Sequence, residues 1–334
     1  MSRDLRGRSF LKEVDWQPDE IEQVLDLAWQ LKAARAAGRE TQHLHGRRLA
    51  LVFEKTSTRT RSAFEVAAFD QGAHVSTFDP TGSHLGHKES IADSARVLGR
   101  MYDAIAYRGE RQADIEALAA HAGVHVYKAL TADWHPPQLL ADYMTMAETA
   151  ARPMREVAYA FVGDLRFNMG RSHAVMAALM GADLRLVGPR ELFPPPDVMA
   201  LAQGIAARTG ARITVTEDPV AGLAGVAFIH TDVWVSMGEP QAEVARRIAL
   251  LRPYRVDARL MGLARDPEVR FMHCLPAFHD AATDVGRAML EQAGLTDGLE
   301  VSDQVFHSTT SIVFDQAENR LHTIKALLVA TLGD

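Results

Sequence analysis

The chain has 334 residues, of which 47% are apolar and 24% are charged, and its formal net charge is −7. This composition is typical of a folded globular protein and excludes a disordered one, while the length suits two domains of ordinary size. The negative charge argues against nucleic acid or an anionic membrane as a bulk partner. No apolar run reaches the roughly 18–20 residues that a membrane-spanning helix needs.

The compartment and the metal content can also be anticipated. The first six residues, Met1 to Arg6, lack the apolar stretch of a secretion signal. The single cysteine, Cys274, excludes an internal disulfide and fits a reducing environment, so we expect a cytoplasmic protein. The 14 histidines show no evident pairing at metal-ligand spacing with further cysteines or carboxylates, and we expect neither a metal site nor a cofactor.

In the first half of the chain, expected helices and strands alternate. A helix opens at Pro18–Asp19–Glu20 and carries its apolar residues on one stripe. The buried strand Leu49–Phe53 follows, and then a helix with Phe64, Ala67 and Ala68 on one face. The other elements expected here are strands at 73–78, 103–107 and 122–127 and helices at 89–101 and from about 137.

The polar stretch Ala151–Arg152–Pro153 divides the chain, and the second half repeats the pattern. Its expected strands lie at 158–162, 184–187, 212–215, 226–229 and 270–273, and a last helix covers 317–332. Strands that alternate with helices indicate parallel sheets covered on both faces. We therefore predict an α/β protein with two doubly wound parallel-sheet domains, at 1–150 and 151–316, joined by helices and followed by a final segment at 317–334.

The most informative stretch is the turn after the first strand, Glu54–Lys55–Thr56–Ser57–Thr58–Arg59–Thr60–Arg61. At the start of a helix, backbone N–H groups lack partners and the helix dipole is positive. Hydroxyl groups can donate to phosphate oxygens, and arginine matches them with a two-pronged fork. The turn therefore predicts an anion site, although no glycine-rich phosphate loop is present. The alternative is a plain helix cap at Ser57 or Thr58 with the arginines in solvent.

Further polar residues of the first half follow other expected strands, and ligands of doubly wound sheets bind beyond the carboxyl ends of strands. Arg108 follows the third strand, and Pro136 and Pro137 hold His135 and Gln138 at the start of a helix. The simpler alternatives are a surface arginine, a capping histidine and a solvated glutamine.

The second half has three similar segments. Asn168 lies in Gly163–Gly170, which lacks the spacing of a dinucleotide-binding loop. Thr231–Glu239 has the composition of a mobile flap, or is an ordinary connection with Trp234 in the core. Cys274 ends the last expected strand, and a lone cysteine is more often a small buried apolar residue than a nucleophile.

Taken together, these segments resemble the aspartate/ornithine carbamoyltransferase family. The motifs occur in the family's order and are Ser57–Thr58–Arg59–Thr60, His135–Pro136–Pro137–Gln138, Asn168–Met169–Gly170, Asp232-x-Trp234-x-Ser236–Met237–Gly238 and His273–Cys274–Leu275–Pro276. The residues around the first motif and the last two motifs resemble the ornithine branch. The resemblance covers the chain from about Leu49 to Leu332.

The resemblance implies roles for individual residues. Those implied to act in catalysis are Arg59, Arg108, His135, Asp232, Cys274 and Arg320. Those implied to bind carbamoyl phosphate are Ser57, Thr58, Arg59, Thr60, His84, Arg108, His135, Gln138, Cys274, Leu275 and Arg320. Those implied to bind ornithine are Asn168, Asp232, Ser236 and Met237. In the family the Leu–Pro bond of the last motif is typically cis, and the last helix, which would carry Arg320 near its start, returns to the first domain.

Three residues depart from the commonest family form. Phe167 and Arg171 flank the Asn168 motif, and His84 stands where many relatives have glutamine. Either side chain at position 84 can donate to a phosphate oxygen, so the resemblance implies the same role for His84.

The implied reaction transfers the carbamoyl group of carbamoyl phosphate to the side-chain amine of L-ornithine and gives L-citrulline and phosphate, a step of arginine metabolism. The implied partners are these small-molecule substrates and further copies of the chain, in a homotrimer or a multiple of trimers. Three alternatives stay open. They are a carbamoyltransferase for another amine such as putrescine or an acylated ornithine, a non-catalytic paralogue, and a nicotinamide dehydrogenase, which the missing glycine fingerprint disfavours.

Overall fold

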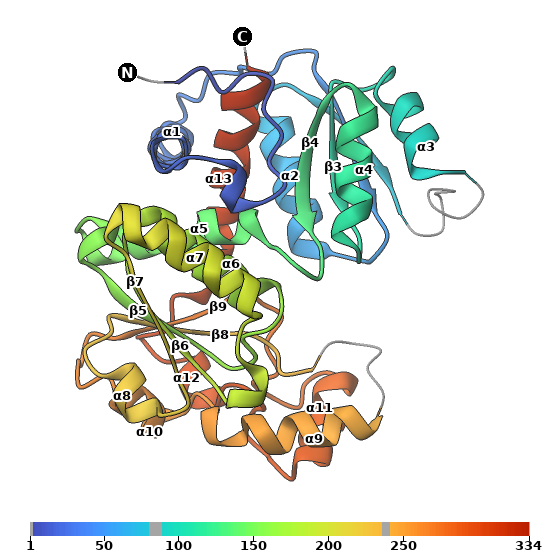
Figure 1. Ribbon diagram of the computed structural model, residues 1–334. Helices are drawn as coiled ribbons and strands as arrows, with labels where there is room; N and C mark the ends of the chain where they lie inside the picture. The colour runs from blue at the N-terminus through green and yellow to red at the C-terminus, as the bar shows by residue number, and fades with distance from the viewer. Residues whose placement is uncertain (1–2, 80–88, 236–240, 334) are drawn as a thin grey trace. The chain divides into compact units, whose positions relative to one another are not determined.

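The computed structural model describes residues 3–79, 89–235 and 241–333 (Figure 1). By its contacts the chain divides into unit 1, Met1–Met144 with Glu318–Asp334, and unit 2, Thr145–Ala317. Each unit holds one parallel sheet between helices, which confirms the predicted α/β class. Within the described ranges, no helix combines the length and the apolar character needed to cross a membrane.

Unit 1 is built on a four-stranded sheet with the order β2-β1-β3-β4, in which every neighbouring pair is parallel. The elements from its first segment are η1 (Glu13–Asp15), α1 (Pro18–Ala36), β1 (Arg48–Phe53), α2 (Thr58–Asp70), β2 (His74–Phe78), α3 (Ile91–Leu98), β3 (Ala104–Arg108), α4 (Gln112–Ala122), β4 (His125–Leu130) and α5 (Pro136–Ala150), of which the last continues into unit 2. Strands β1 and β3 are buried along nearly their whole length, because helices cover the sheet (Figure 1).

Unit 2 is built on a five-stranded parallel sheet with the order β7-β6-β5-β8-β9. Its elements are η2 (Met154–Glu156), β5 (Ala158–Val162), α6 (Asn168–Met180), β6 (Asp183–Val187), η3 (Arg190–Leu192), α7 (Pro196–Thr209), β7 (Arg212–Thr216), α8 (Pro219–Leu223), β8 (Phe228–Thr231), α9 (Gln241–Leu251), η4 (Arg252–Tyr254), α10 (Ala258–Gly262), β9 (Arg270–His273), α11 (Asp284–Ala293) and α12 (Asp303–Phe306).

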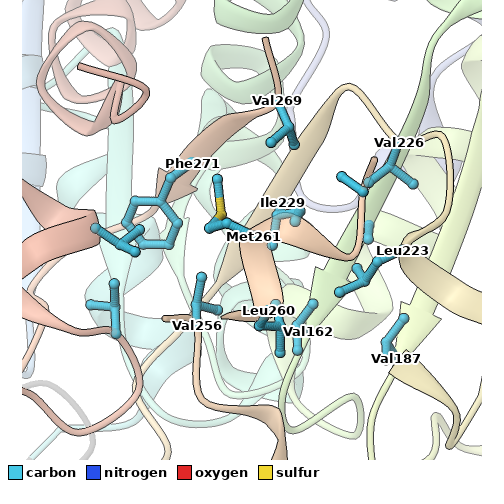
Figure 2. Packing of buried hydrophobic residues seen from close by; sticks show 14 of the residues in the cluster. Val162, Val187, Leu223, Val226, Ile229, Val256, Leu260, Met261, Val269 and Phe271 are labelled. Carbon is cyan, nitrogen blue, oxygen red and sulfur yellow. The ribbon is translucent and has the colours of Figure 1, made fainter. Parts of the chain in front are cut away.

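One apolar cluster holds α10 against the sheet of unit 2. Figure 2 shows Ile229 of β8 and Phe271 of β9 beside Leu260 and Met261 of α10. Ile229, Leu260 and Phe271 are completely buried, and full burial of such a side chain contributes about 1.5–3 kcal/mol to stability. This packing positions the carboxyl ends of β8 and β9, where two of the site segments begin.

Every strand of both sheets overlaps its predicted range, and the largest displacement is in β4. The sequence predicts this strand at 122–127, whereas the structure has it at His125–Leu130. Helix α4 continues through Ala122, and Gly123 ends it in the left-handed conformation (φ 69°) that glycine adopts without a steric penalty. The last residue of α4 and its C-cap glycine therefore occupy the first two positions of the predicted strand.

The last helix also differs from its prediction, because α13 spans Val313–Leu332 rather than 317–332. Arg320 consequently lies in the interior of a helix and not near its start. From Asn319 on, α13 is buried on nearly all sides within unit 1, including the charged side chain of Lys325. The return of this helix to the first unit agrees with the predicted architecture.

Candidate functional site

The predicted anion site lies where β1 ends and α2 begins. Helix α2 starts at Thr58, and the side chain of its N-cap residue, Ser57, makes no capping hydrogen bond. None of the residues in the first turn of α2 is acidic. No acidic side chain of the helix's own first turn therefore offsets its positive end, and the capping alternative for Ser57 is wrong.

Two guanidinium groups meet at one hydroxyl group in this turn. Arg320 Nη2 donates to Thr60 Oγ1 at 2.7 Å, and Arg108 Nη1 donates to the same atom at 3.5 Å. Thr60 and Arg320 are 1% and 4% exposed, and Arg108 is half-buried. The surface alternative for Arg108 is therefore wrong, and Arg320 is buried as well. Two like charges held together beside a helix N-terminus attract an anion, such as a phosphate group.

Sheet register explains why these residues meet. Strands β1 and β3 are neighbours, and Phe53 pairs with Arg108 at their carboxyl ends. Two other basic residues of this turn pair with carboxylates. Lys55 forms an ion pair with Glu110, and Arg61 donates to Glu65 at 2.8 Å. Arg59, in the first turn of α2, is half-buried.

His135 and Gln138 lie at the start of α5 and are 4% and 1% exposed. Burial lowers the pKa of His135 well below its usual value, and the positive charges of Arg320, Arg108 and Lys128 lower it further. The imidazole is therefore neutral near pH 7 and offers one N–H donor.

Gln138 offers a hydrogen-bond acceptor beside the N–H donor of His135. Its Nε2 atom donates to Asp142 Oδ1 at 2.8 Å. Its Oε1 atom is buried and has no hydrogen-bond partner among the described residues. A buried acceptor without a partner is unfavourable, so this oxygen is suited to a ligand that brings an N–H group. The alternative of a solvated Gln138 is wrong.

Lys128 is a site-associated residue that the sequence analysis did not identify. It lies in β4, is fully buried and donates to Gln112 Oε1. Burial lowers the pKa of Lys128 to about 7, although the carboxylates of Glu13 and Asp133 act in the opposite direction. The predicted strand at 122–127 ends before Lys128, so nothing in the sequence marked this lysine as part of a buried strand.

In unit 2, three predicted site segments follow adjacent strands. Asn168 is the first residue of α6 after β5, Asp232 directly follows β8, and Cys274 directly follows β9. Because β5, β8 and β9 are neighbours in a parallel sheet, their carboxyl ends lie at one edge. The Sγ–H group of Cys274 donates to Asp232 Oδ1 at 3.1 Å, so these two predicted residues are in direct contact.

The electrostatic state of Asp232 differs from that of a surface carboxylate. The residue as a whole is half-buried, but protein atoms enclose its carboxyl group, and this burial raises its pKa. His273 and the thiol of Cys274 oppose the rise. Such a carboxylate gains more than an exposed one from an incoming cationic group.

The segment after β9 has an unusual backbone. Leu275 has φ 56°, a region that non-glycine residues rarely occupy, and the Leu275–Pro276 bond is cis, as the resemblance implied. The Leu275 N–H group donates to His273 Nδ1 at 2.9 Å, and His273 Nε2 lies 3.4 Å from Glu300 Oε1. His273 and Glu300 are both buried, and the hydrogen bond from the Leu275 N–H group to the buried His273 ring holds the backbone next to Cys274.

The residues that depart from the commonest family form pack locally. The guanidinium groups of Arg166 and Arg247 lie 5.1 and 5.4 Å from the centre of the Phe167 ring. Arg171 Nε donates to the Arg166 carbonyl oxygen at 2.6 Å. These contacts order the segment before Asn168.

Of the predicted flap Thr231–Glu239, the structure describes only the first half. Trp234 is 1% exposed and packs in an apolar cluster with Ile248 and Leu290, so the core alternative is correct for this side chain. Three predicted site residues, His84, Ser236 and Met237, lie outside the described residues.

Two family models match the chain, one in its first half and one in its second. Residues 8–148 match the model of the aspartate/ornithine carbamoyltransferase carbamoyl-P binding domain. Residues 155–331 match the model of the aspartate/ornithine carbamoyltransferase Asp/Orn binding domain.

Individual proteins are similar over their whole lengths. A protein of Rhizobium meliloti (strain 1021) named "Ornithine carbamoyltransferase, catabolic" is 54% identical, with 100% of both chains covered. A protein of Chromobacterium violaceum with the same name is 55% identical, again with 100% of both chains covered. The solved structure of an ornithine carbamoyltransferase from Pyrococcus furiosus matches with a TM-score of 0.89 and 36% identity, over 99% of this chain and 98% of that one.

Proposed function

This chain belongs to the aspartate/ornithine carbamoyltransferase family, and we propose that it transfers the carbamoyl group of carbamoyl phosphate to the side-chain amine of L-ornithine. The products are L-citrulline and phosphate. The observation that carries this proposal is the identity of 54% and 55% to two proteins named ornithine carbamoyltransferase, each matched from end to end. The word "catabolic" in both names leaves the direction of the reaction in the cell open.

We assign carbamoyl phosphate to residues of unit 1. Its phosphate group would accept hydrogen bonds from the α2 N-terminus, from the hydroxyl groups beside it and from the arginines: Ser57, Thr58, Arg59, Thr60, Arg108 and, outside the described residues, His84. The converging guanidinium groups at Thr60 support this assignment. The amide N–H of the carbamoyl group would donate to the buried Gln138 Oε1 atom, which has no partner among the described residues.

We assign ornithine to residues of unit 2. Asn168 would bind its carboxylate, and Asp232 would accept from an amino group, with Cys274 positioning the reacting amine. Outside the described residues, Ser236 and Met237 would close over the ligand. The contact between Asp232 and Cys274 supports a shared role, and no covalent intermediate on Cys274 is needed.

The reaction requires a neutral amine. If the side-chain amine of ornithine titrates like lysine, with a pKa of about 10.4, freeing it at pH 7 costs roughly 4–5 kcal/mol. An enclosed site reduces this cost because it disfavours the charged form. The amine nitrogen then bonds to the carbamoyl carbon, the carbon–oxygen bond to phosphate breaks, and the proton that the nitrogen loses passes to the departing phosphate, directly or through water.

The tetrahedral intermediate carries negative charge on the former carbonyl oxygen. Preorganised donors stabilise such an oxyanion most when they sit in a site that excludes water. His135, neutral and buried, supplies one N–H group, and the buried guanidinium of Arg320 supplies further donors and a positive charge. Thr58 adds a hydroxyl group at the first position of α2.

The amine specificity can be tested with a panel of acceptors. Purified protein is mixed with carbamoyl phosphate and with ornithine, putrescine or N-acetylornithine, and the ureido product is measured. We expect ornithine to be preferred in kcat/KM on the order of 100-fold or more, because polar groups built to bind the carboxylate and amino groups of ornithine are left unpaired by the other amines.

A variant makes the test specific to this site. Asn168→Ala removes the assigned carboxylate partner, so the preference for ornithine over putrescine should shrink while putrescine turnover is kept. Faster turnover of another amine by the wild type would overturn the ornithine assignment and leave the carbamoyl phosphate half in place. Absence of turnover with all three amines would indicate a non-catalytic paralogue.

The assembly and the compartment follow from the resemblance to the family. We propose a homotrimer, or a multiple of trimers, in the cytoplasm. Light scattering after size-exclusion chromatography should give a mass of three, or a multiple of three, times the 36.7 kDa of one chain. A monomer or dimer would contradict this assembly.

A further inference from the structure

Two histidines and an aspartate converge in unit 2, outside the residues assigned to either substrate. They are His279, in the loop between β9 and α11, Asp303, at the start of the short helix α12, and His307, directly after it (Figure 1). Asp303 and His307 are one helical turn apart, but His279 joins them only through the fold. The order of residues along the chain therefore gives no sign of a metal-ligand pairing here.

The donor atoms lie at distances that a metal ion can bridge. His279 Nδ1 is 2.8 Å and His307 Nε2 is 3.5 Å from Asp303 Oδ1, and all three donor atoms lie within 4.8 Å of one another. In a tetrahedral zinc site, bonds of roughly 2.0–2.2 Å place neighbouring donor atoms about 3.3–3.6 Å apart. The Asp303–His307 separation already lies in this range, the Asp303–His279 separation is about 0.5 Å below it, and the two imidazole nitrogens would approach by up to about 1.2 Å to complete a coordination sphere.

The His279 ring is held in place. It stacks on Phe306, with ring centres 3.8 Å apart and an angle of 5° between the planes, and Phe306 belongs to the apolar core of unit 2. The preceding residue is fixed on both sides, because the Phe278 N–H group donates to Glu300 Oε1 at 2.6 Å and the Phe278 carbonyl oxygen accepts from the Leu299 N–H group at 2.7 Å.

A glycine permits this close approach of the two chain segments. Gly298 has φ 108°, and a Cβ atom at this position would lie 2.8 Å from the His279 carbonyl oxygen. A preformed donor set of this kind lowers the ordering cost of binding a ligand.

Charge and access also favour a cation. The side chains of Asp303 and His307 are 48% and 58% exposed, so an ion can enter from solvent without opening the fold. A second carboxylate, Asp280, has its Oδ2 atom 3.9 Å from His279 Nδ1. Two imidazoles with two carboxylates can neutralise a divalent ion, and imidazole with carboxylate is a donor set used by zinc and its neighbours.

We propose that His279, Asp303 and His307 form a binding site for Zn²⁺ or a similar late first-row divalent ion, with Asp280 beside it. Bound metal would join the loop at 277–283 to α12. Because the same loop continues from the Cys274–Pro276 segment, the ion would stiffen the chain that leads away from the proposed ornithine site. The inference does not depend on the proposed function.

The test uses the full-length protein, freed of metal with a chelator and titrated with Zn²⁺ by calorimetry. We expect one equivalent to bind, and the affinity to fall by at least about tenfold in His307→Gln, because a direct ligand matters at least as much as an outer-shell partner. His307 is exposed, so this variant should fold. The matched control is His121→Gln, which removes an exposed histidine of unit 1.

A second readout separates this site from the neighbouring group of Asp232, His273 and Cys274, which also places possible ligands close together. Cys274→Ser should leave the Zn²⁺ affinity unchanged, and Co²⁺ bound at the proposed site should lack the charge-transfer band of a thiolate ligand. Anomalous diffraction from a zinc-soaked crystal should place the ion against His279 and His307. Unchanged affinity in His307→Gln, loss of binding in Cys274→Ser, or no binding by the wild type would overturn the proposal.

Discussion

A single hydroxyl group organises the arginines of unit 1. Thr60 Oγ1 accepts from Arg320 at 2.7 Å and from Arg108 at 3.5 Å, and Thr60 is buried. Replacing it with valine keeps the shape but removes the acceptor that both guanidinium groups share. Loss of a partner for buried or charged donors costs on the order of 1–3 kcal/mol.

We therefore expect Thr60→Val to raise the KM for carbamoyl phosphate by about tenfold, measured at saturating ornithine. Ser62→Ala is the control, because Ser62 is an exposed residue on the same helix. An unchanged KM in Thr60→Val would show that the shared hydroxyl does not position the arginines.

Lys128 predicts a pH dependence of stability. Burial lowers the pKa of this side chain to about 7 in the folded protein, from 10.5 in the unfolded chain. Between these values the unfolded state binds more protons, so the free energy of unfolding contributed by Lys128 rises with pH from about 7 towards 10.5. Below about pH 7 both states are protonated and the contribution is constant.

Urea unfolding at pH 6, 8 and 9.5 measures this effect. The wild type should gain stability over this interval relative to Lys128→Met, which lacks the titrating group. Lys55→Met, at an exposed lysine that pairs with Glu110, serves as the control and should follow the wild type. Parallel curves for the wild type and Lys128→Met would contradict the burial argument.

Individual residues could be predicted from the sequence where they belong to a recognisable motif, and the structure brings several of them into contact. Thr60, Arg108 and Arg320 meet although 260 residues separate the first and the last. Lys128 escaped notice because the strand was predicted to end at Tyr127, which placed the lysine outside it, whereas β4 continues to Leu130.

At the element scale, the strands were predictable because each is a short apolar run between polar turns, buried on both faces of a parallel sheet. Two predicted boundaries, at the start of β4 and at the start of α13, differ from the observed ones. A glycine cap displaced β4, and α13 extends four residues before its predicted start, to Val313. The exposed Phe314 in that first turn does not continue the apolar stripe on which the prediction rested.

The last helix is fixed to unit 1 by a buried ion pair as well as by apolar packing. Lys325 Nζ donates to Glu40 Oε1 at 2.5 Å and to Asp70 Oδ2 at 2.8 Å, and the lysine is completely buried. Removing the lysine would leave two carboxylates without this cation, and breaking such a buried pair costs about 3–5 kcal/mol.

Lys325→Met should therefore lower the free energy of unfolding by about 3–5 kcal/mol in urea titrations. The control is Arg212→Ala, which removes a 70% exposed partner of Asp183 and should cost less than about 1 kcal/mol. Equal effects of the two substitutions would contradict a stabilising role for the buried pair.

At the scale of the whole molecule, the proposed substrate groups are distributed between the units. The residues assigned to the phosphate end belong to unit 1, and those assigned to the amino acid belong to unit 2. Arg59→Gln should thus abolish most carbamoyl phosphate binding in calorimetry, whereas Asp232→Asn should retain it and lose ornithine turnover. Equal loss of carbamoyl phosphate binding in both variants would contradict this division.

The family and the two-sheet architecture were predictable from the sequence because motifs occur in order along the whole chain. The proposed metal site could not be predicted from the sequence, because His279 reaches Asp303 only after β9, the following loop and α12 have packed. Sequence order therefore predicts the substrate-binding segments better than it predicts contacts created by tertiary packing.

The transfer reaction can be tested by following the carbamoyl carbon itself. Carbamoyl phosphate labelled with ¹³C at the carbonyl is incubated with ornithine and the wild-type protein, and the label is followed by NMR. We predict that its signal moves to the ureido carbon of citrulline, and that Arg59→Gln and Asp232→Asn strongly slow this conversion. Release of the label only as cyanate and bicarbonate, at the rate seen without protein, would contradict the assignment of this chain as an ornithine carbamoyltransferase.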